Sequence, residues 1–148
     1  MTELANSTLR QTDTVELCMD ARPENLVLAR LALGGIVART PLGDDVVADL
    51  KVAVTEACTN SIEHAYGEDP GANEIVVRFA LDGEALAVEV QDWGIGFDAD
   101  AEPVHDEELR DHAGVGLMLI RSLTDELTIE SSGSGSTVSF AKRLRPPG

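Results

Sequence analysis

Two neighbouring segments with alternating apolar and polar residues constrain the fold more than any other feature of this sequence. Residues 74–82, EIVVRFALD, and residues 84–92, EALAVEVQD, place apolar side chains at every second position. This period is typical of strands that bury one face against a core. The dipeptide Asp82-Gly83 between them is a strong hairpin signal. The sequence therefore predicts an antiparallel hairpin.

The segments on either side add strands and helices to this hairpin. Further strands are predicted at residues 14–20, 127–132 and 136–144, the last two joined through a Gly/Ser-rich turn. Helices are predicted at residues 23–38, beginning at Pro23, at residues 46–66, capped by Asp44 or Asp45, and at residues 117–127. This order predicts an α+β fold, a two-layer sandwich with helices on one face of a mostly antiparallel sheet. We expect a flexible tail over residues 1–13, a single domain over 14–143 and a frayed end over 144–148.

Composition and charge exclude several classes of function. The chain has 148 residues, enough for one domain with its own core, and a net charge of −16. Such a surface repels nucleic acid and anionic lipid, so no direct contact with nucleic acid or membrane is expected. The most apolar run contains Arg30 and is too short to span a bilayer, and the N-terminus has no signal peptide pattern. We expect a cytoplasmic protein whose Cys18 and Cys58 are buried free thiols.

One predicted helix carries an unusual polar stripe. Glu56, Asn60 and His64 lie four residues apart in EACTNSIEHAYG, on a different face from the apolar positions of the same helix. Taken alone, the stripe fits a solvated helix face at least as well as a site. Helix-end packing or capping explains His64 about as well as ligand binding does.

Two glycine-containing motifs lie downstream of this stripe. In DWGIGFD, Asp92 ends a strand and precedes Gly94 and Gly96, so a carboxylate there could accept a hydrogen bond from an amino group such as that of adenine. In HAGVGLMLI, glycines directly precede a helix, whose free N–H groups and dipole favour a phosphate. The long acidic segment between the two motifs is typical of a lid loop. Each motif alone is a weak signal.

The order of these motifs is more specific than any one of them. E-x-x-x-N, D-x-G-x-G, G-x-G-L-x-x-I and a Gly/Ser-rich turn with threonine follow one another, and no P-loop, Rossmann or protein-kinase motif is present. From Thr14 to about Lys142, the sequence resembles the Bergerat-type ATP-binding fold of gyrase, the large heat-shock chaperone, histidine kinases and mismatch-repair ATPases.

This resemblance implies a role for particular residues. Glu56 would be the catalytic general base, and Asn60 would bridge Mg²⁺ and the phosphates of ATP. Asp92 would bind adenine, supported by Thr137. The remaining ATP-binding positions implied by the resemblance are His64, Gly94, Gly96, Arg110, Gly114, Val115, Gly116 and Leu117.

Within the superfamily, the chain is similar to the anti-sigma-factor serine/threonine kinases of bacterial partner-switching systems. The expected helix pair with a phospho-accepting histidine, found in sensor kinases, is absent from the sequence. The resemblance implies that the protein sequesters a sigma factor and phosphorylates an anti-sigma-factor antagonist, with Mg-ATP as co-substrate. It also implies a homodimer and a partner contact at Arg30, although a solvated charge or an intrachain salt bridge explains Arg30 more simply.

One departure from the family pattern keeps two alternatives open. Relatives often carry a basic residue close before the first glycine of the second motif, where this chain has Arg110 and His112 in an acidic segment. Without a cation at the γ-phosphate, ATP binding could persist while transfer is slow. The alternatives are therefore a nucleotide-dependent protein-binding module without significant kinase activity, or the ATPase domain of a sensor-kinase system.

Overall fold

The computed structural model describes residues 13–65, 73–94, 115–132 and 135–145 of the chain. The elements are, in chain order, β1 (Asp13–Asp20), the 3₁₀ turn η1 (Pro23–Asn25), α2 (Leu26–Val37), α3 (Asp44–Ala65), β2 (Glu74–Leu81), β3 (Ala85–Asp92), α5 (Val115–Leu123), β4 (Glu126–Ser132) and β5 (Gly135–Arg143). This is the order predicted from the sequence. Pro23 opens a 3₁₀ turn rather than the α-helix itself.

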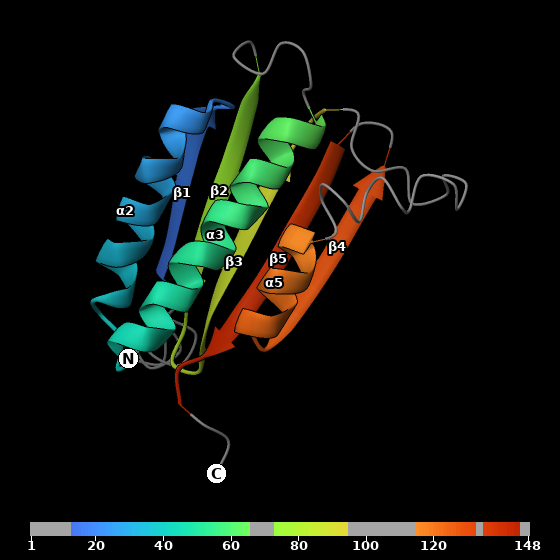
Figure 1. Cartoon of the computed structure of the whole chain (residues 1–148). Coiled ribbons are helices and arrows are strands. Elements are labelled where there is room, and N and C mark those ends of the chain that lie inside the picture. Colours follow the sequence, from blue (N-terminus) through green and yellow to red (C-terminus); the bar gives the residue numbers. More distant parts are fainter. Residues whose placement is uncertain (1–12, 66–72, 95–114, 133–134, 146–148) are drawn as a thin grey trace, which may run out of the picture.

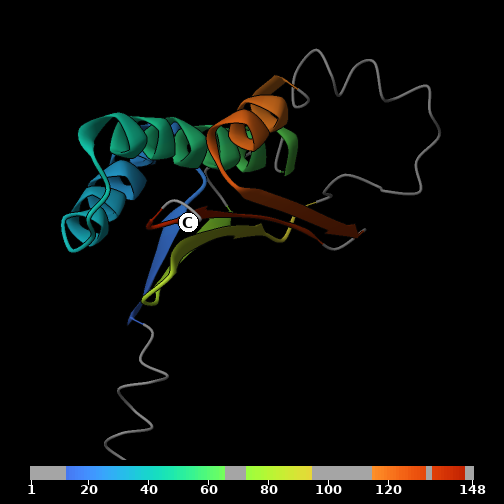
Figure 2. The ribbon, with the colours of Figure 1, turned by 90° about the horizontal axis from the view of Figure 1, so that it is seen from below.

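The strands form one sheet in the order β1-β2-β3-β5-β4, and every neighbouring pair of strands is antiparallel. Figures 1 and 2 show α2, α3 and α5 together on one face of this sheet. The opposite face, which we call the open face, carries no helix among the described residues. The two-layer α+β fold is confirmed.

The core fills the space between the helices and the sheet. Every second residue of the central strands is buried there, including Val77 and Phe79 on β2 and Val88 and Val90 on β3. Helix α3 packs on the sheet through the buried residues Leu50, Val54, Ala57 and Ser61. Burying each large aliphatic side chain contributes about 1.5–3 kcal/mol, so this layer contact supplies much of the folding free energy.

The longest helix, α3, begins two residues earlier than predicted. Val47 N–H donates to the carbonyl of Gly43, so Asp44 and Asp45 lie inside the first turn and do not precede it as caps. Their carboxylates still stabilise the helix, because its N-terminus carries partial positive charge. In the described ranges, no helix has the length and apolar character required to cross a bilayer.

The β2–β3 hairpin forms where predicted, but its turn is closed by a side chain. Asp82 Oδ1 accepts hydrogen bonds from the N–H groups of Glu84, at 2.7 Å, and Ala85, at 2.9 Å. These bonds hold the pKa of the Asp82 carboxyl below its usual value. Gly83 does not adopt a positive φ. The turn therefore depends on the Asp82 carboxylate and not on the freedom of Gly83.

Helix α5 ends at Leu123, four residues before the predicted end. Thr124 Oγ1 donates to the Ile120 carbonyl, and Asp125 N–H already pairs with the Ala141 carbonyl of β5. Glu126 and Leu127 consequently belong to β4. Pairing along the sheet edge overrides the helical pattern at these positions.

The two cysteines lie in different environments, which corrects the expectation that both are buried. Cys58 is fully buried on α3, and desolvation raises the pKa of its thiol to about 12. Cys18 is exposed. It alternates with Met19 of the core on the edge strand β1, so its side chain lies on the open face.

Gly135 is the first residue of β5, and no other residue type fits this position without strain. Its φ is 150°, a region that favours glycine. A Cβ at this position would lie 2.3 Å from the Asp92 carbonyl oxygen and 3.1 Å from Trp93 Cα. Both neighbours are backbone atoms, so neither can move without displacing β3.

We predict that Gly135→Ala lowers the free energy of unfolding by about 1–3 kcal/mol or more, because it combines overpacking with backbone strain. Urea unfolding measures this change. The control is Gly83→Ala, where a Cβ has no neighbour within 4 Å and φ is not positive. The control should change stability by less than about 1 kcal/mol. Equal losses in both variants would contradict the close approach seen at Gly135.

Candidate functional site

The Asp92 carboxylate is buried at the end of β3 and joins that strand to the start of β5. Its side chain accepts three hydrogen bonds: from Gly94 N–H at 3.2 Å, from Ser136 N–H at 3.2 Å and from the Ser136 hydroxyl at 2.8 Å. A carboxylate offers about four lone-pair sites. Asp92 is therefore fixed in orientation while it keeps capacity for a further donor, such as a ligand amino group.

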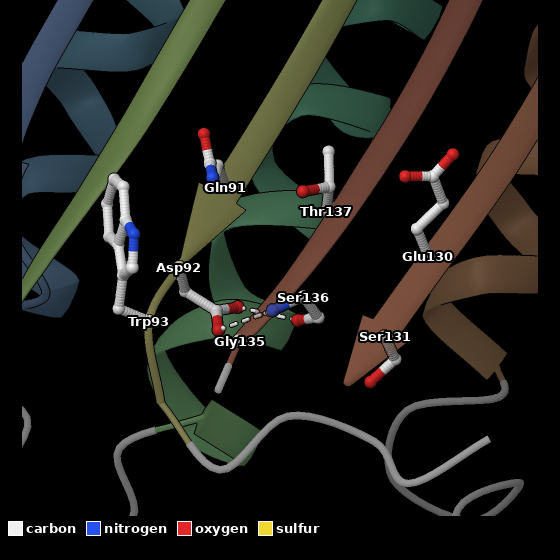
Figure 3. A pocket seen from close by; sticks show the side chains of 8 residues that line it. All are labelled: Gln91, Asp92, Trp93, Glu130, Ser131, Gly135, Ser136 and Thr137. Atoms are coloured by element: carbon white, nitrogen blue, oxygen red, sulfur yellow. Dashed lines mark hydrogen bonds between the residues drawn. The ribbon is translucent and has the colours of Figure 1, made fainter. Parts of the chain in front are cut away.

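Ser136, and not Thr137, is the hydroxyl residue that contacts Asp92. Ser136 is buried beside Val138 and Phe140 on the side of β5 that faces the helices. Thr137 lies between them in the alternation, and Figure 3 shows its side chain pointing away from the Asp92–Ser136 contact. Counting back from the core residues Val138 and Phe140 would have identified Ser136 from the sequence.

Asn60 has the buried environment that a ligand position requires. The residue is 6% exposed on α3, and its Oδ1 atom has no hydrogen-bond partner among the described residues. Leaving a buried acceptor unsatisfied costs about 1–3 kcal/mol, so such an atom calls for an explanation. An amide oxygen is a suitable ligand for Mg²⁺. The Asn60 environment thus fits the metal and phosphate position that the family resemblance implies.

Glu56 precedes Asn60 by one helical turn and contacts the start of α5. A Cβ at Gly116 would lie 2.8 Å from Glu56 Oε2, so the absence of a side chain at Gly116 allows the carboxylate to approach the α5 backbone. Gly116 is the second residue of α5, where N–H groups lack intrahelical partners. Val115 before it is largely exposed, and Leu117 after it packs against the core.

The elements that carry these residues converge at one end of the molecule. Figure 1 shows that the C-terminal ends of α3 and β3, the start of β5 and the N-terminal end of α5 point the same way. Asn60, Asp92 and Ser136 all lie on the buried side, between the two layers. The polar stripe on α3 and the strand-end carboxylate are therefore brought to one end of the layer boundary.

Several predicted positions lie outside the described residues. These are Gly96, Arg110 and Gly114, together with most of the proposed lid loop; the backbone of His64 belongs to α3, but its side chain is not described. Their assignment to the site remains a prediction.

Arg30 lies apart from Asp92, on the outer surface between α2 and α3. Its Nη1 donates to Thr55 Oγ1 at 3.3 Å, and together they line a hollow of about 320 Å³ with Lys51, Val52 and Glu56. Within the described ranges Arg30 forms no salt bridge. The guanidinium is half-buried and keeps donors for other groups.

The fold is that of an ATP-binding domain of the Bergerat type. Residues 19–142 match the histidine kinase-like ATPase domain, and the chain belongs to this family.

Curated relatives cover most of the chain. It is 38% identical over 140 residues to the serine-protein kinase RsbW of Bacillus velezensis, covering 89% of this chain and 86% of that protein. It is 37% identical to RsbW of Bacillus subtilis over 140 residues, with the same coverage. RsbW of Listeria monocytogenes is 38% identical over 126 residues, 79% of each chain.

A solved structure shows the same fold. The RsbU and RsbW domains of Rv1364c from Mycobacterium tuberculosis superpose with a TM-score of 0.67 at 24% identity. The match covers 92% of this chain and 34% of that longer one.

We predict that Ser136→Ala lowers the free energy of unfolding by about 1.5–3 kcal/mol, because it removes a hydrogen bond to a buried charge. Thr137→Ala, the matched control on the adjacent residue, should change it by about 0.5 kcal/mol or less. Chemical unfolding of both variants makes the comparison. A larger loss in Thr137→Ala would show that Thr137, and not Ser136, supports Asp92.

Proposed function

We propose that this chain is an anti-sigma factor that binds ATP and phosphorylates a serine or threonine of an anti-sigma-factor antagonist. The relatives named serine-protein kinases, which match most of its length at 36–38% identity, support this activity. The membership of the histidine kinase-like ATPase family supports nucleotide binding.

The observation that carries the proposal is the position of Glu56 relative to Asn60 and Gly116. One helical turn separates the carboxylate from the unpartnered amide oxygen of Asn60, and the same carboxylate lies beside the N-terminal backbone of α5. A base, a metal ligand and an anion-favouring helix end are therefore adjacent. Enzymes that transfer phosphoryl groups use residues of these kinds to position the nucleophile and to offset the charge on the phosphates.

The proposed reaction assigns a separate task to each group. Glu56 accepts the proton of the acceptor hydroxyl, whose oxygen forms a bond to the γ-phosphorus while the bond from that phosphorus to the ADP oxygen breaks. Asn60 Oδ1 would hold Mg²⁺, which supplies positive charge next to the phosphates when it is bound. N–H groups at the start of α5 stabilise negative charge on the transferred group.

Adenine recognition in this proposal belongs to Asp92. Its carboxylate is oriented by Ser136 and Gly94, and a remaining lone pair accepts a hydrogen bond from the exocyclic amino group of the base. Because no reorientation is needed on binding, little conformational entropy is lost there.

We propose that partners dock on the outer surface of α2 around Arg30. Large apolar side chains of α2, and Val52 in the hollow beside Arg30, are exposed in the structure: Val27 by 45%, Leu28 by 43%, Leu31 by 67% and Val52 by 40%. An exposed apolar group around a half-buried cation is typical of the centre of a protein interface. The hollow beside Arg30 also includes Glu56, so a docked antagonist segment would reach the proposed base.

The partner-switching proposal further implies a sigma factor as the second partner, a homodimer and a cytoplasmic location. A nucleotide-dependent sequestrant without kinase activity, or a sensor-kinase ATPase domain, would bind ATP equally well. Phosphotransfer separates these alternatives. The test is incubation with labelled ATP, Mg²⁺ and each candidate antagonist encoded nearby, and transfer of label to a serine or threonine is the expected result. ATP binding without transfer to any candidate would favour the sequestrant.

We predict that Glu56→Gln and Asn60→Ala separate chemistry from binding. Glu56→Gln removes the base but keeps the shape of the side chain, so ATP binding should persist while phosphotransfer falls by about 10²–10⁴-fold. Asn60→Ala removes the amide oxygen and should abolish most of the Mg²⁺-dependent part of ATP affinity. Calorimetry with and without Mg²⁺, together with transfer assays, measures both effects.

Two outcomes would contradict these roles. If Glu56→Gln loses ATP affinity as much as transfer, Glu56 supports the metal or the fold and is not the base. If Asn60→Ala binds Mg-ATP as the wild type does, the metal lies elsewhere.

We predict that Arg30→Ala weakens sigma-factor or antagonist binding by about 2–5 kcal/mol if the guanidinium pairs with a buried carboxylate of the partner. ATP affinity should not change, because Arg30 lies away from Asp92. Arg121→Ala, which removes an exposed arginine from the last turn of α5, is the matched control. Partner affinity is measured by calorimetry. If Arg30→Ala bound both partners as tightly as the wild type does, Arg30 would have no role in partner binding and would be a surface charge that bonds to Thr55.

A further inference from the structure

A second hollow lies on the open face of the sheet, behind the Asp92–Ser136 contact. Its volume is about 370 Å³, and it is lined by Gln91, Asp92, Trp93, Glu130, Ser131, Gly135, Ser136 and Thr137. Figure 3 views it with the helices behind the strands, and shows Trp93 and Glu130 on opposite sides with Gln91 and Thr137 between them. We call this hollow the Trp93 trough.

Strand pairing explains how these side chains come to form a row. Gln91 on β3 pairs with Thr137 on β5, and Thr137 pairs with Glu130 on β4, so all three side chains share the open face. Trp93 follows the end of β3 beside this row. One intervening strand separates Trp93 from Glu130, which places their backbones roughly 10 Å apart.

The trough offers an aromatic face and free acceptors. Trp93 is 53% exposed. Among the described residues, the side chains of Gln91, Thr137 and Glu130 form no hydrogen bond or salt bridge with other protein groups. These groups are therefore available to a ligand that carries several donors.

The trough borders the candidate nucleotide site, but most of its side chains lie on the opposite side of the sheet. The Asp92 carboxylate and the Ser136 hydroxyl lie on the helix side of the sheet and bond to each other there. Trp93, Thr137 and Glu130 lie on the other side. Because Asp92 and Ser136 also line the trough, a ligand there would lie next to the strand ends that carry the candidate adenine-binding groups.

Charge and shape restrict the class of ligand. The net charge of −16 and the Glu130 carboxylate disfavour a phosphate or an acidic peptide. A flat cation satisfies both sides of the trough, because it stacks on an indole and forms paired hydrogen bonds with a carboxylate. Arginine meets these needs, while lysine has neither the planar group nor the fork of donors.

We propose that the Trp93 trough binds an arginine side chain from a basic segment of a partner protein, with the guanidinium between the Trp93 indole and the Glu130 carboxylate. Gln91 Oε1 and the Thr137 hydroxyl accept its remaining N–H groups. This site is independent of the proposed phosphotransfer and of the surface around Arg30. It gives the sheet face a docking role that complements the helical face.

Trp93 is the single tryptophan of the chain, so its fluorescence reports on the trough directly. The experiment titrates the full chain at low ionic strength with the capped tripeptide acetyl-Gly-Arg-Gly-amide. The same peptide with citrulline in place of arginine is the neutral control. We expect a saturable change in Trp93 emission with the arginine peptide and at least a threefold weaker response to citrulline.

A pair of variants separates specific contact from general attraction to an acidic protein. Glu130→Gln and Glu126→Gln each remove one negative charge from the open face of β4, but Glu126 lies at the other end of that strand. Glu130→Gln should weaken arginine-peptide binding roughly two- to fivefold, and Glu126→Gln should leave it unchanged. Trp93→Leu, followed by amide NMR shifts, should also weaken binding.

Three results would overturn the proposal. The first is equal weakening in Glu130→Gln and Glu126→Gln, which indicates general charge attraction. The second is an equal response to the citrulline peptide. The third is a change in Trp93 emission with protein concentration alone, in step with a doubling of mass, which would mean that a second copy of the chain covers the trough. Unfolding curves and ATP affinity equal to those of the wild type confirm that each variant is folded.

Discussion

The hydrogen bonds between Asp92 and Ser136 fix the end of the sheet on which the proposed site depends. They join the last residue of β3 to the second residue of β5, and these two strands are distant in sequence. Gly135 allows the two backbones to approach closely enough for these bonds to form. A carboxylate at this position would cost free energy if it were buried without donors, so the Ser136 hydroxyl and the backbone N–H groups are what permit its burial.

Helix α3 links this strand end to the proposed chemistry. Its apolar face, which includes Leu50 and Val54, is buried against the sheet and sets the height of the helix above it. Glu56 and Asn60 are therefore held in place by the packing of their neighbours. In the described part of the chain, Asn60 Oδ1 has no partner at its buried position, and the core contacts of α3 offset that cost. The burial of the apolar face of α3 thus stabilises a fold in which the Asn60 oxygen is available to a ligand.

The two faces of the sheet present different surfaces to partners. Helices cover one face, and the exposed apolar residues around Arg30 lie on the outside of that layer. The open face is polar, and salt bridges from Arg78 to Glu16 and Glu89 cross three of its strands. The Trp93 trough interrupts this paired surface near the end of β3, next to the strand end that carries Asp92. Contacts on the two faces can consequently be tested by separate substitutions.

The alternation of β2 and β3, the apolar face of α3 and the motif order could all be predicted from sequence, because each is a local pattern with a fixed period. The resemblance implied Thr137 as the support of the adenine contact, whereas Ser136 is the residue that bonds to Asp92. The alternation back from Val138 and Phe140 puts Ser136 on the helix side of β5, but only the pairing of β3 with β5 brings it to Asp92. The burial of Cys18 was also mispredicted, because only the assembled sheet shows that β1 is an edge strand with an open face. Similarly, Glu126 and Leu127 were predicted to be helical but belong to β4, because they pair with residues of β5.

The sequence by itself determined the elements, their order, the family resemblance and the chemical types of the site residues. The tertiary structure decided which of those side chains meet. Contacts such as Glu56 with Gly116 and Asp92 with Ser136 join positions 60 and 44 residues apart, and no local period encodes them. They follow from packing α3 and α5 on the same face of the sheet and from pairing β3 with β5, because burial of apolar surface holds the layers together and thereby sets which polar groups can meet.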